Sequence, residues 1–328
     1  MADYGVLLEK LLKRRYDEAR RESIVSDSYE HRGYSDCLKY TLESMTEIDH
    51  SYSYKIYSIA RKIQDKLDNA FQKSRLNIDF RYEGPIQTET HITLFGDVTL
   101  LVIVRPQSDK PWQEVQMVIK GAVPALKELE TVKEVTYNKQ QLIIVTQKPS
   151  CRVVVQPAVW LNNKSFLDSH REIDRGICEF NFGEKTKRNH LPFMNIARIN
   201  HKDERTNGGL KRIIRLLRTL QKDAEPTIQL TDYEIASIVY DIPEKQLKYN
   251  PKKALSLLTV GSAQLTRLCS DQKYFETLQS PSQREVIFGK KPKKEEVQRL
   301  KSTLDQLIKD IQNELNKESK DIYSEIIY

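Results

Sequence analysis

The chain has 328 residues, of which 39% are hydrophobic and 30% are charged, and its formal net charge is +7. This composition is typical of a soluble globular protein, and no apolar run approaches the roughly 20 residues that a membrane helix needs. The length favours two domains, and the N-terminal segment lacks the apolar centre of a signal peptide. We therefore expect a cytoplasmic protein without membrane insertion.

The cysteines and the charge narrow the possible sites and partners. The four cysteines are scattered without a C-x-x-C pair, which argues against both a disulfide framework and a zinc site. A positive net charge favours polyanionic partners such as nucleotides or nucleic acid. Many basic proteins without such partners have a similar charge, so the charge supports a polyanionic partner only where sequence motifs also point to one.

Two amphipathic helices are predicted in the first eighty residues. Apolar side chains recur at helical spacing over residues 6–22 and, more regularly, over residues 51–73. Both patterns are typical of packing helices that carry no chemistry.

The stretch of residues 81–106 is the centre of the predicted fold. It reads RYEGPIQTETHITLFGDVTLLVIVRP and contains a glycine turn, hydroxyl and amide side chains, and an apolar run that opens directly after Asp97. A β-branched run of this kind, between a Gly-Asp turn and a proline, predicts a strand buried on both faces. Asp97 is then expected at the mouth of a central strand.

More strands are predicted in the first half of the chain, and helices in the second half. Residues 142–146 and 152–159 are β-branched runs, and a helix is predicted at residues 122–129. The patterns become helical from Thr206 onward, after a charged segment near residues 182–190. We expect an α+β fold of two lobes with a cleft between them. The expected parts are residues 1–190, a mixed-sheet core with the N-terminal helices; 191–317, a helical lobe; and 318–328, a tail.

The helix predicted at residues 210–222 carries a row of cations beside its apolar face. A row of this kind is either a solvated face or a binding surface. Gly208 and Gly209 precede the helix, and phosphate binds readily at a helix N-terminus, which favours binding. The cations recur at spacings of four, three and four, and they are Lys211, Arg215, Arg218 and Lys222.

Five motifs follow one another in a distinctive order. They are T-H-I after the glycine turn, a G-D-x-x-L-L-V-I-V strand, a V-V-x-P-A strand, an R-T-N-G-G-L-K-R-I-I-R-L-L-R-T-L helix and a D-Y-E-I-A-S-I-V-Y helix. This order, over residues 50–310, resembles the polymerase-β-type nucleotidyltransferases. More narrowly, it resembles the bacterial relatives of cyclic GMP-AMP synthase called CD-NTases. The resemblance implies a two-lobed nucleotidyltransferase fold and a role in anti-phage defence.

The resemblance also implies a metal-dependent reaction. Nucleotidyl transfer from ATP or a dNTP to a hydroxyl uses two divalent metals, Mg²⁺ or Mn²⁺, held by three carboxylates on two neighbouring strands. Asp97 matches the first carboxylate, whereas Thr99 and Val154 occupy the second and third positions. The charge available to the metals therefore falls from about three to one. Pro85 replaces the serine expected after the turn glycine, which removes a backbone donor.

Other residues of the central stretch match the turn of the family. Gly84, Thr88 and Thr90 correspond to the turn that surrounds the phosphates. Glu89 lies in the same loop and is a candidate metal ligand that supplements Asp97. A solvated surface charge is the alternative for Glu89.

The second half supplies the remaining matches. Lys211 corresponds to the helical-lobe lysine that reaches the triphosphate, and Tyr233 to the aromatic residue that stacks on the base. Asp232 stands where a small hydroxyl residue is usual. The alternatives are a solvated charge for Lys211 and a core aromatic for Tyr233.

The chain ends in KDIYSEIIY, which places Tyr328 on a short tail. A nucleotidyltransferase needs a hydroxyl acceptor, and a tethered phenol is a candidate primer for oligonucleotide synthesis. A frayed end, or a docking strip for a partner, is the alternative.

Two functions remain open from the sequence. The first is an enzyme that makes a nucleotide signal or short oligonucleotide, which an effector protein encoded alongside then reads. The second is an inactive pseudo-nucleotidyltransferase that binds nucleotide or oligonucleotide and regulates a partner. The two missing carboxylates favour the second, and the order of motifs favours the first. A general nucleic-acid-binding protein is weaker, because no regular recognition element is present.

Overall fold

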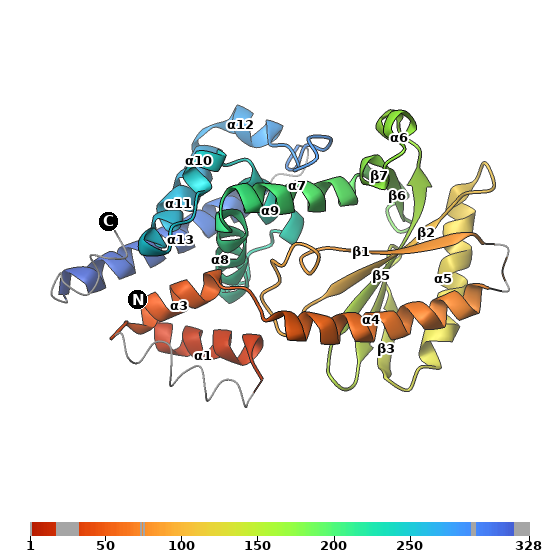
Figure 1. The fold of residues 1–328 in the computed structure, drawn as a ribbon, viewed down its shortest axis with the longest axis horizontal. Helices are drawn as coiled ribbons and strands as arrows, with labels where there is room; N and C mark the ends of the chain where they lie inside the picture. The colour runs from red at the N-terminus through yellow and green to blue at the C-terminus, as the bar shows by residue number, and fades with distance from the viewer. Residues whose placement is uncertain (1, 18–32, 73, 75, 290–292, 318–328) are drawn as a thin grey trace. The chain divides into compact units, whose positions relative to one another are not determined.

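The computed structural model describes residues 2–17, 33–72, 74, 76–289 and 293–317. The chain forms two compact units (Figure 1). A mixed sheet with helices in one unit, and helices in the other, confirm the expected α+β class with a sheet lobe and a helical lobe. The sheet unit comprises residues 49–91 and 95–197, and the helical unit comprises residues 1–48, 92–94 and 198–328.

The sheet unit is built on a mixed sheet. Its strands in the described residues are β1 (Ile78–Glu83), β2 (Val98–Val104), β3 (Val132–Tyr137), β4 (Leu142–Thr146), β5 (Arg152–Leu161), β6 (Gly176–Asn181) and β7 (Thr186–His190). The central pair, β2 and β5, is parallel. On one side of this pair β1 joins β2 antiparallel. On the other side, the first half of β5 pairs with β4, and its second half pairs with β6. β3 and β7 are the outer partners of β4 and β6.

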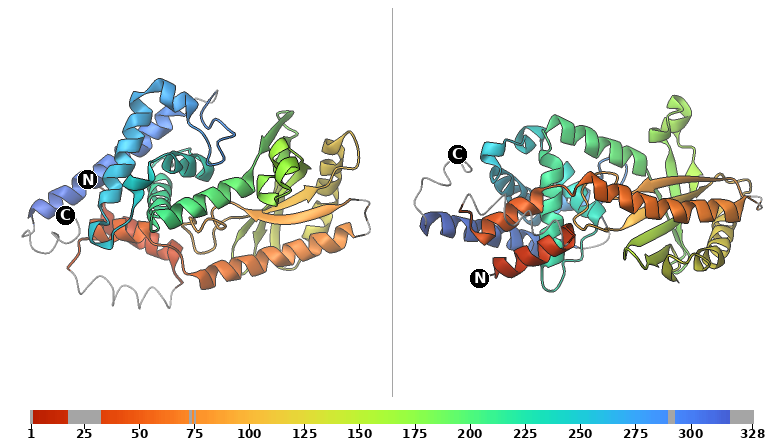
Figure 2. Two further views of the ribbon diagram at one scale, coloured as in Figure 1. Left: turned by 45° about the horizontal axis from the view of Figure 1, so that its top comes forward. Right: turned by 60° about the horizontal axis from the view of Figure 1, so that its bottom comes forward.

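Strand β2 is buried on both faces, as its sequence predicts. Alternate residues from Val98 to Val104 pack beneath α4 (His50–Phe71) and α5 (Pro111–Lys127). The residues between them, Leu101 and Ile103, pack into a separate apolar cluster on the opposite face. Figures 1 and 2 show the two helices running along the sheet.

Helix α4 forms where the apolar stripe predicts a helix. Its buried residues recur every three or four positions, and the Asp49 carboxylate caps its start by accepting a hydrogen bond of 2.8 Å from the Ser51 backbone N–H. A helix of this kind is stabilised mainly by burial of one apolar face against the sheet.

The helical unit is organised around α8 (Gly209–Asp223), which is buried over most of its length. The other elements of this unit in the described residues are α1 (Tyr4–Arg15), α3 (Asp36–Met45), α9 (Asp232–Tyr240), α10 (Glu244–Leu247), η4 (Pro251–Lys253), α11 (Ser256–Ser270), α12 (Gln272–Thr277) and α13 (Lys294–Lys317). Of these, α3, α9, α11 and α13 contact α8. Their apolar side chains form one core that is separate from that of the sheet.

The division of the chain differs from the expected boundary at residue 190. Helices α1 and α3 belong to the helical unit, because Leu38, Tyr40 and Met45 of α3 are buried among its apolar side chains, whereas α4 belongs to the sheet unit. The other boundary along the chain falls between residues 197 and 198, within α7 (Pro192–Arg205). Two short elements, α6 (Lys164–Ser169) and η3 (Glu172–Asp174), lie between β5 and β6.

None of the helices in the described residues combines the length and the apolarity that a membrane crossing requires.

Candidate functional site

The turn after β1 brings the start of β2 close to a glycine. Gly84 has a φ of 86°, a conformation that glycine adopts without strain. A Cβ atom at this position would lie 3.7 Å from the Thr99 hydroxyl oxygen. The turn is closed by hydrogen bonds from the Gln87 N–H to the Gly84 carbonyl and from the Thr90 N–H to the Pro85 carbonyl, of 3.0 and 2.8 Å.

The two threonines of the turn point into it. Their hydroxyl oxygens lie 2.9 Å apart in hydrogen-bonding contact, and Thr88 and Thr90 are only 6% and 3% exposed. These hydroxyls therefore stabilise the turn itself. Contact of either residue with a phosphate stays a prediction.

Glu89 is partly exposed, with 43% of its side-chain surface accessible. Its φ is 54°, in the left-handed region. Its carboxylate lies 3.9 Å from Nδ1 of His50. The geometry leaves its proposed role as a metal ligand untested.

The register of β2 and β5 places the positions of interest side by side. Thr99 pairs directly with Val154, and Val98 pairs with Val153. Paired residues of neighbouring strands project from the same face. Thr99 and Val154 therefore project together from the face opposite the one that α4 and α5 cover.

Asp97 precedes β2 and forms an ion pair with Arg152, the first residue of β5. Both side chains are about half exposed. The guanidinium thus neutralises the one carboxylate at the head of these strands.

A cluster of titratable residues on the same sheet face was not identified from the sequence. Glu83 pairs with Thr99 in the register of β1 and β2. Buried Glu179 of β6 lies 3.1 Å from Nε2 of buried His190, at the end of β7. Burial and the Glu179 charge raise the pKa of Glu83 to about 7.

The Glu179–His190 pair is charged because each group stabilises the other. Burial alone disfavours both charges, but the contact lowers the pKa of Glu179 and raises the pKa of His190. The sequence does contain a signal for this pair. Glu179 is an acidic residue directly after Cys178 in the buried strand sequence GICEFN, and it was not identified as a site residue.

Three of the four cations in the α8 row, Lys211, Arg215 and Arg218, are buried, whereas Lys222 is exposed. The Lys211 ammonium lies 3.9 Å from the Asp203 carboxylate, and its side chain is 11% exposed. Arg215 is buried and donates a hydrogen bond of 2.9 Å to the Met45 carbonyl. Burial lowers the pKa of Arg215 to about 10, so its guanidinium keeps its charge at neutral pH.

The N-terminus of α8 is already occupied by the protein itself. The Leu210 N–H donates to the Thr206 hydroxyl at 3.3 Å, and the Lys211 N–H donates to the Asp203 carboxylate at 2.8 Å. Gly209 is required for a different reason than phosphate access, because a Cβ there would lie 1.8 Å from the Leu247 carbonyl oxygen. These internal caps satisfy two of the N–H groups at this helix end, and approach of a phosphate to it stays a prediction.

Tyr233 and Asp232 lie in the first turn of α9. The Tyr233 hydroxyl donates a hydrogen bond of 2.5 Å to Glu285, and its ring is partly buried. Asp232 accepts a hydrogen bond of 2.7 Å from Arg218, the third cation of the row. Stacking of the Tyr233 ring on a base stays a prediction.

Comparison with known proteins identifies this arrangement. Residues 197–312 match the family model of the cGAS/DncV-like nucleotidyltransferase C-terminal helical domain. The cyclic dinucleotide synthase CdnE of Yersinia aleksiciae is 26% identical over 344 residues, which cover 97% of this chain and 90% of that protein. The structure of the STING-associated CdnE c-di-GMP synthase of Capnocytophaga granulosa matches with a TM-score of 0.80 and 25% identity, over 96% of this chain and 100% of that one.

The chain is therefore similar to CD-NTases over nearly its whole length. The resemblance expected from the motifs is thereby confirmed. A more distant CD-NTase, the Rhodothermus marinus CdnE c-UMP-AMP synthase with Apcpp and Upnpp, shares the fold with a TM-score of 0.61 at 15% identity, over 81% of this chain and 94% of that one.

The positions that the CD-NTase resemblance assigns to metal ligands do not fit a divalent metal pair in this chain. Asp97 is neutralised by Arg152, Thr99 offers a neutral hydroxyl, and Val154 offers no donor atom. Mg²⁺ and Mn²⁺ prefer several anionic oxygens, and the described residues contain no group of three or more His, Cys, Asp or Glu side chains arranged to hold a metal. Tyr328, the candidate primer, lies outside the described residues.

Proposed function

We propose that this chain is a CD-NTase of bacterial anti-phage defence that binds a nucleotide without converting it, and that it regulates a partner protein according to nucleotide occupancy. The observation that carries the proposal is the direct pairing of Thr99 with Val154 beside the Asp97–Arg152 ion pair. Metal-assisted nucleotidyl transfer needs concentrated negative charge at these strand ends, and here the charges cancel.

The binding half of the proposal rests on the helical unit. Lys211 and Tyr233 keep the residue types that the family uses for the triphosphate and the base. Lys211 is held by Asp203, and Tyr233 by Glu285, so both side chains have defined positions. Preorganised side chains lose less conformational entropy when a ligand binds.

The partner is proposed from the same relationship. The Capnocytophaga relative is described as STING-associated. A nucleotide-binding relative without catalysis acts through protein contacts, and an effector encoded alongside is the proposed recipient. A cytoplasmic location is part of the same proposal.

A second function is favoured by the similar proteins themselves. The Yersinia and Capnocytophaga relatives are synthases, and the likeness spans nearly the whole of each chain. In this alternative Asp97, with Glu89, holds Mg²⁺ or Mn²⁺. The chain then transfers nucleotidyl groups from NTPs or dNTPs, with Tyr328 as a primer.

Product assays with labelled NTPs and dNTPs, in Mg²⁺ and in Mn²⁺, separate the two functions. We expect no nucleotide product with either metal, together with a rise in Tm on nucleotide addition, because a ligand that binds the native state raises its stability. A product that is made by the chain and lost in Asp97→Ala overturns the proposal and supports the synthase. Intact-mass analysis of the C-terminal peptide reports whether Tyr328 acquires a nucleotide.

A further inference from the structure

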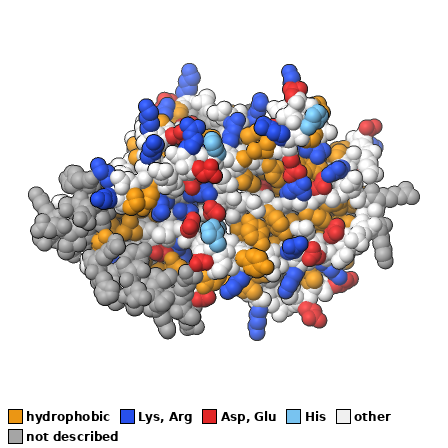
Figure 3. Space-filling view, in the orientation of Figure 1, with side chains coloured by type: hydrophobic (Ala, Val, Ile, Leu, Met, Phe, Trp, Pro, Cys, Tyr) orange, Lys and Arg blue, Asp and Glu red, His pale blue; other side chains and the backbone are white. Residues whose placement is uncertain are grey.

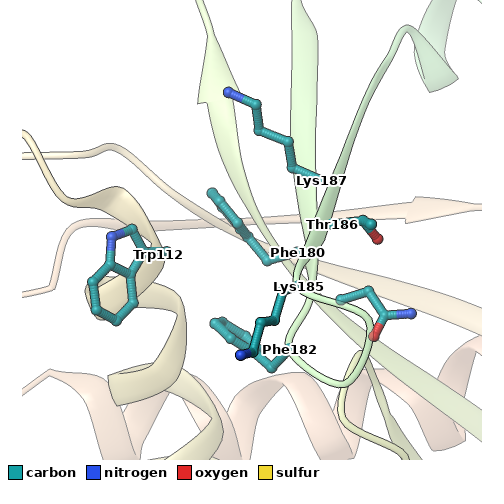
Figure 4. Close-up of a pocket in the computed structure, with 7 residues that line it drawn as sticks. Trp112, Phe180, Phe182, Lys185, Thr186 and Lys187 are labelled. Carbon is teal, nitrogen blue, oxygen red and sulfur yellow. The ribbon is translucent and has the colours of Figure 1, made fainter.

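The sheet unit contains an aromatic hollow that the proposed function does not use. Its volume is about 460 Å³, within the usual range for ligand pockets. Trp112, in the first turn of α5, lies on one side, and Phe180 and Phe182 lie on the other, at the end of β6 (Figure 4). Lys185 and Lys187, which follow in the chain, also line it.

Three aromatic rings supply the walls of the hollow. Phe180 and Phe182 have ring centroids 6.2 Å apart and planes only 20° from parallel, so their faces share one direction. Trp112 is 41% exposed, which is unusual for so large an apolar side chain. These rings form an accessible surface on which a flat, unsaturated ligand can stack.

Cations surround the rings. Within the described residues, no carboxylate forms an ion pair with Lys185 or Lys187. The turn between β3 and β4 contacts the end of β6, because the Lys139 carbonyl accepts a hydrogen bond of 2.8 Å from the Phe182 N–H. Glu184 is exposed in the turn between β6 and β7 but does not line the hollow.

The hollow and the proposed nucleotide site are separate in the sheet. Phe180 and Phe182 pack with the residues beneath α4 and α5, whereas Thr99 and Val154 project from the opposite face. On the surface shown in Figure 3, Lys and Arg side chains are interspersed with Asp and Glu. A combination of clustered rings and unpaired lysines therefore distinguishes the hollow from a general positive surface.

We propose that this hollow binds single-stranded nucleic acid. One or two bases stack on Trp112 and the phenylalanine rings, and Lys185 and Lys187 contact the adjacent phosphates. Exposed rings beside cations are the combination by which proteins hold unpaired bases without reading their sequence. A duplex keeps its bases stacked and offers only its phosphates, and an acidic peptide offers charge without a base.

Fluorescence anisotropy of a labelled 12-nucleotide oligo(dT) or oligo(U) tests the proposal on the full chain at low salt. We expect Trp112→Ala to weaken binding by about 10-fold, from the loss of one stacked base. The double variant Lys185→Ala and Lys187→Ala makes the negative slope of log K against log salt concentration shallower by roughly 1.4, because two phosphate contacts are lost. Tyr137→Ala and Lys133→Ala on β3 are matched exposed controls and leave both quantities unchanged.

Intrinsic fluorescence adds a readout that requires no label. The chain has two tryptophans, and Trp160 is buried, so quenching by the oligonucleotide reports on Trp112. Trp112→Phe keeps a ring and retains most of the affinity, which covers the case in which Trp112→Ala does not fold.

Three results overturn the inference: wild-type affinity in Trp112→Ala, equal affinity for a duplex of the same length, or equal binding of poly-glutamate. The nucleotide site is tested separately with Lys211→Ala. Oligonucleotide binding that is lost in Lys211→Ala and kept in Trp112→Ala removes the hollow and leaves the proposed function standing.

Discussion

The start of strands β2 and β5 differs from helix α8 in how far it carries the residue types that the family resemblance predicts. At the strands, the backbone register is intact while two of three acidic positions hold threonine and valine. In α8, the basic side chains remain, and each of Lys211, Arg215 and Arg218 contacts a defined partner.

The difference shows how strongly a side chain is tied to the fold. The carboxylates expected at positions 99 and 154 act on a ligand, so their replacement leaves the sheet undisturbed. The cations of α8 also stabilise their own unit, because a buried charge left without its partner is costly. Substitution of the buried α8 cations is therefore expected to cost more stability than substitution at position 99.

The largest effect is expected in the helical unit, from Gly209→Ala. The added Cβ would lie 1.8 Å from the Leu247 carbonyl oxygen, which is backbone and cannot move aside easily. We expect a loss of more than about 3 kcal/mol in the free energy of unfolding, measured by urea denaturation. Gly5→Ala in α1, where the nearest atom is 3.3 Å away, is the control. Equal stability of the two variants would falsify the close approach.

A smaller effect is expected at the strands, from Thr99→Asp combined with Val154→Asp. A carboxylate at position 154, where valine is 6% exposed, lowers stability by about 2–3 kcal/mol. Millimolar Mg²⁺ or Mn²⁺ then recovers part of the loss, because the new carboxylates and Asp97 form an anionic group. The matched Thr99→Asn and Val154→Asn pair loses stability without recovery. Identical metal responses in the two pairs would mean that these positions do not converge.

A third effect concerns pH and the Glu83 carboxyl. Its folded pKa of about 7 lies above the ordinary value, so ionisation opposes folding, and the free energy of unfolding falls as pH rises from about 4.5 to 7. Glu83→Gln removes this cost, and we expect it to be more stable than wild type at pH 8 by on the order of 2 kcal/mol, with little difference at pH 4. Thermal unfolding across this range checks it, with exposed Glu134→Gln as control. A constant difference at all pH values contradicts the assignment.

The smallest effect is expected in the nucleotide-induced change in Tm, which reports ligand binding separately from the stability of the free chain. Lys211→Ala is expected to abolish the rise in Tm that nucleotide produces in the wild-type chain, whereas Lys222→Ala, at the other end of the row, retains it. The measurement is thermal shift at saturating nucleotide. A wild-type response in Lys211→Ala excludes this lysine from the site.

The sequence predicted the elements whose apolar pattern is strong. Strand β2, helix α4 and helix α8 were located because long periodic runs mark them. Strands β1, β3, β6 and β7 were missed. β1 reads IDFRYE and carries the alternating pattern of a half-buried strand, whereas β7 reads TKRNH and holds one buried residue, which gives no apolar pattern.

The candidate site was predicted only as far as local motifs allow. Asp97, Thr99 and Val154 were assigned by family order, and the strand register places the last two side by side. The Arg152 partner of Asp97 and the Glu179–His190 pair depend on which strands become neighbours. Such pairings arise from tertiary structure, and no spacing along the chain encodes them. The internal capping of α8 by Asp203 was missed for the same reason.

The Arg152 guanidinium couples Asp97 to the neighbouring positions 99 and 154. A lone acidic substitution at position 99 would be drawn into the same ion pair, while one at position 154 would be desolvated before any cation arrived to stabilise it. Neither single substitution is therefore expected to concentrate negative charge at these strand ends. A metal-binding group here requires acidic side chains at both positions together.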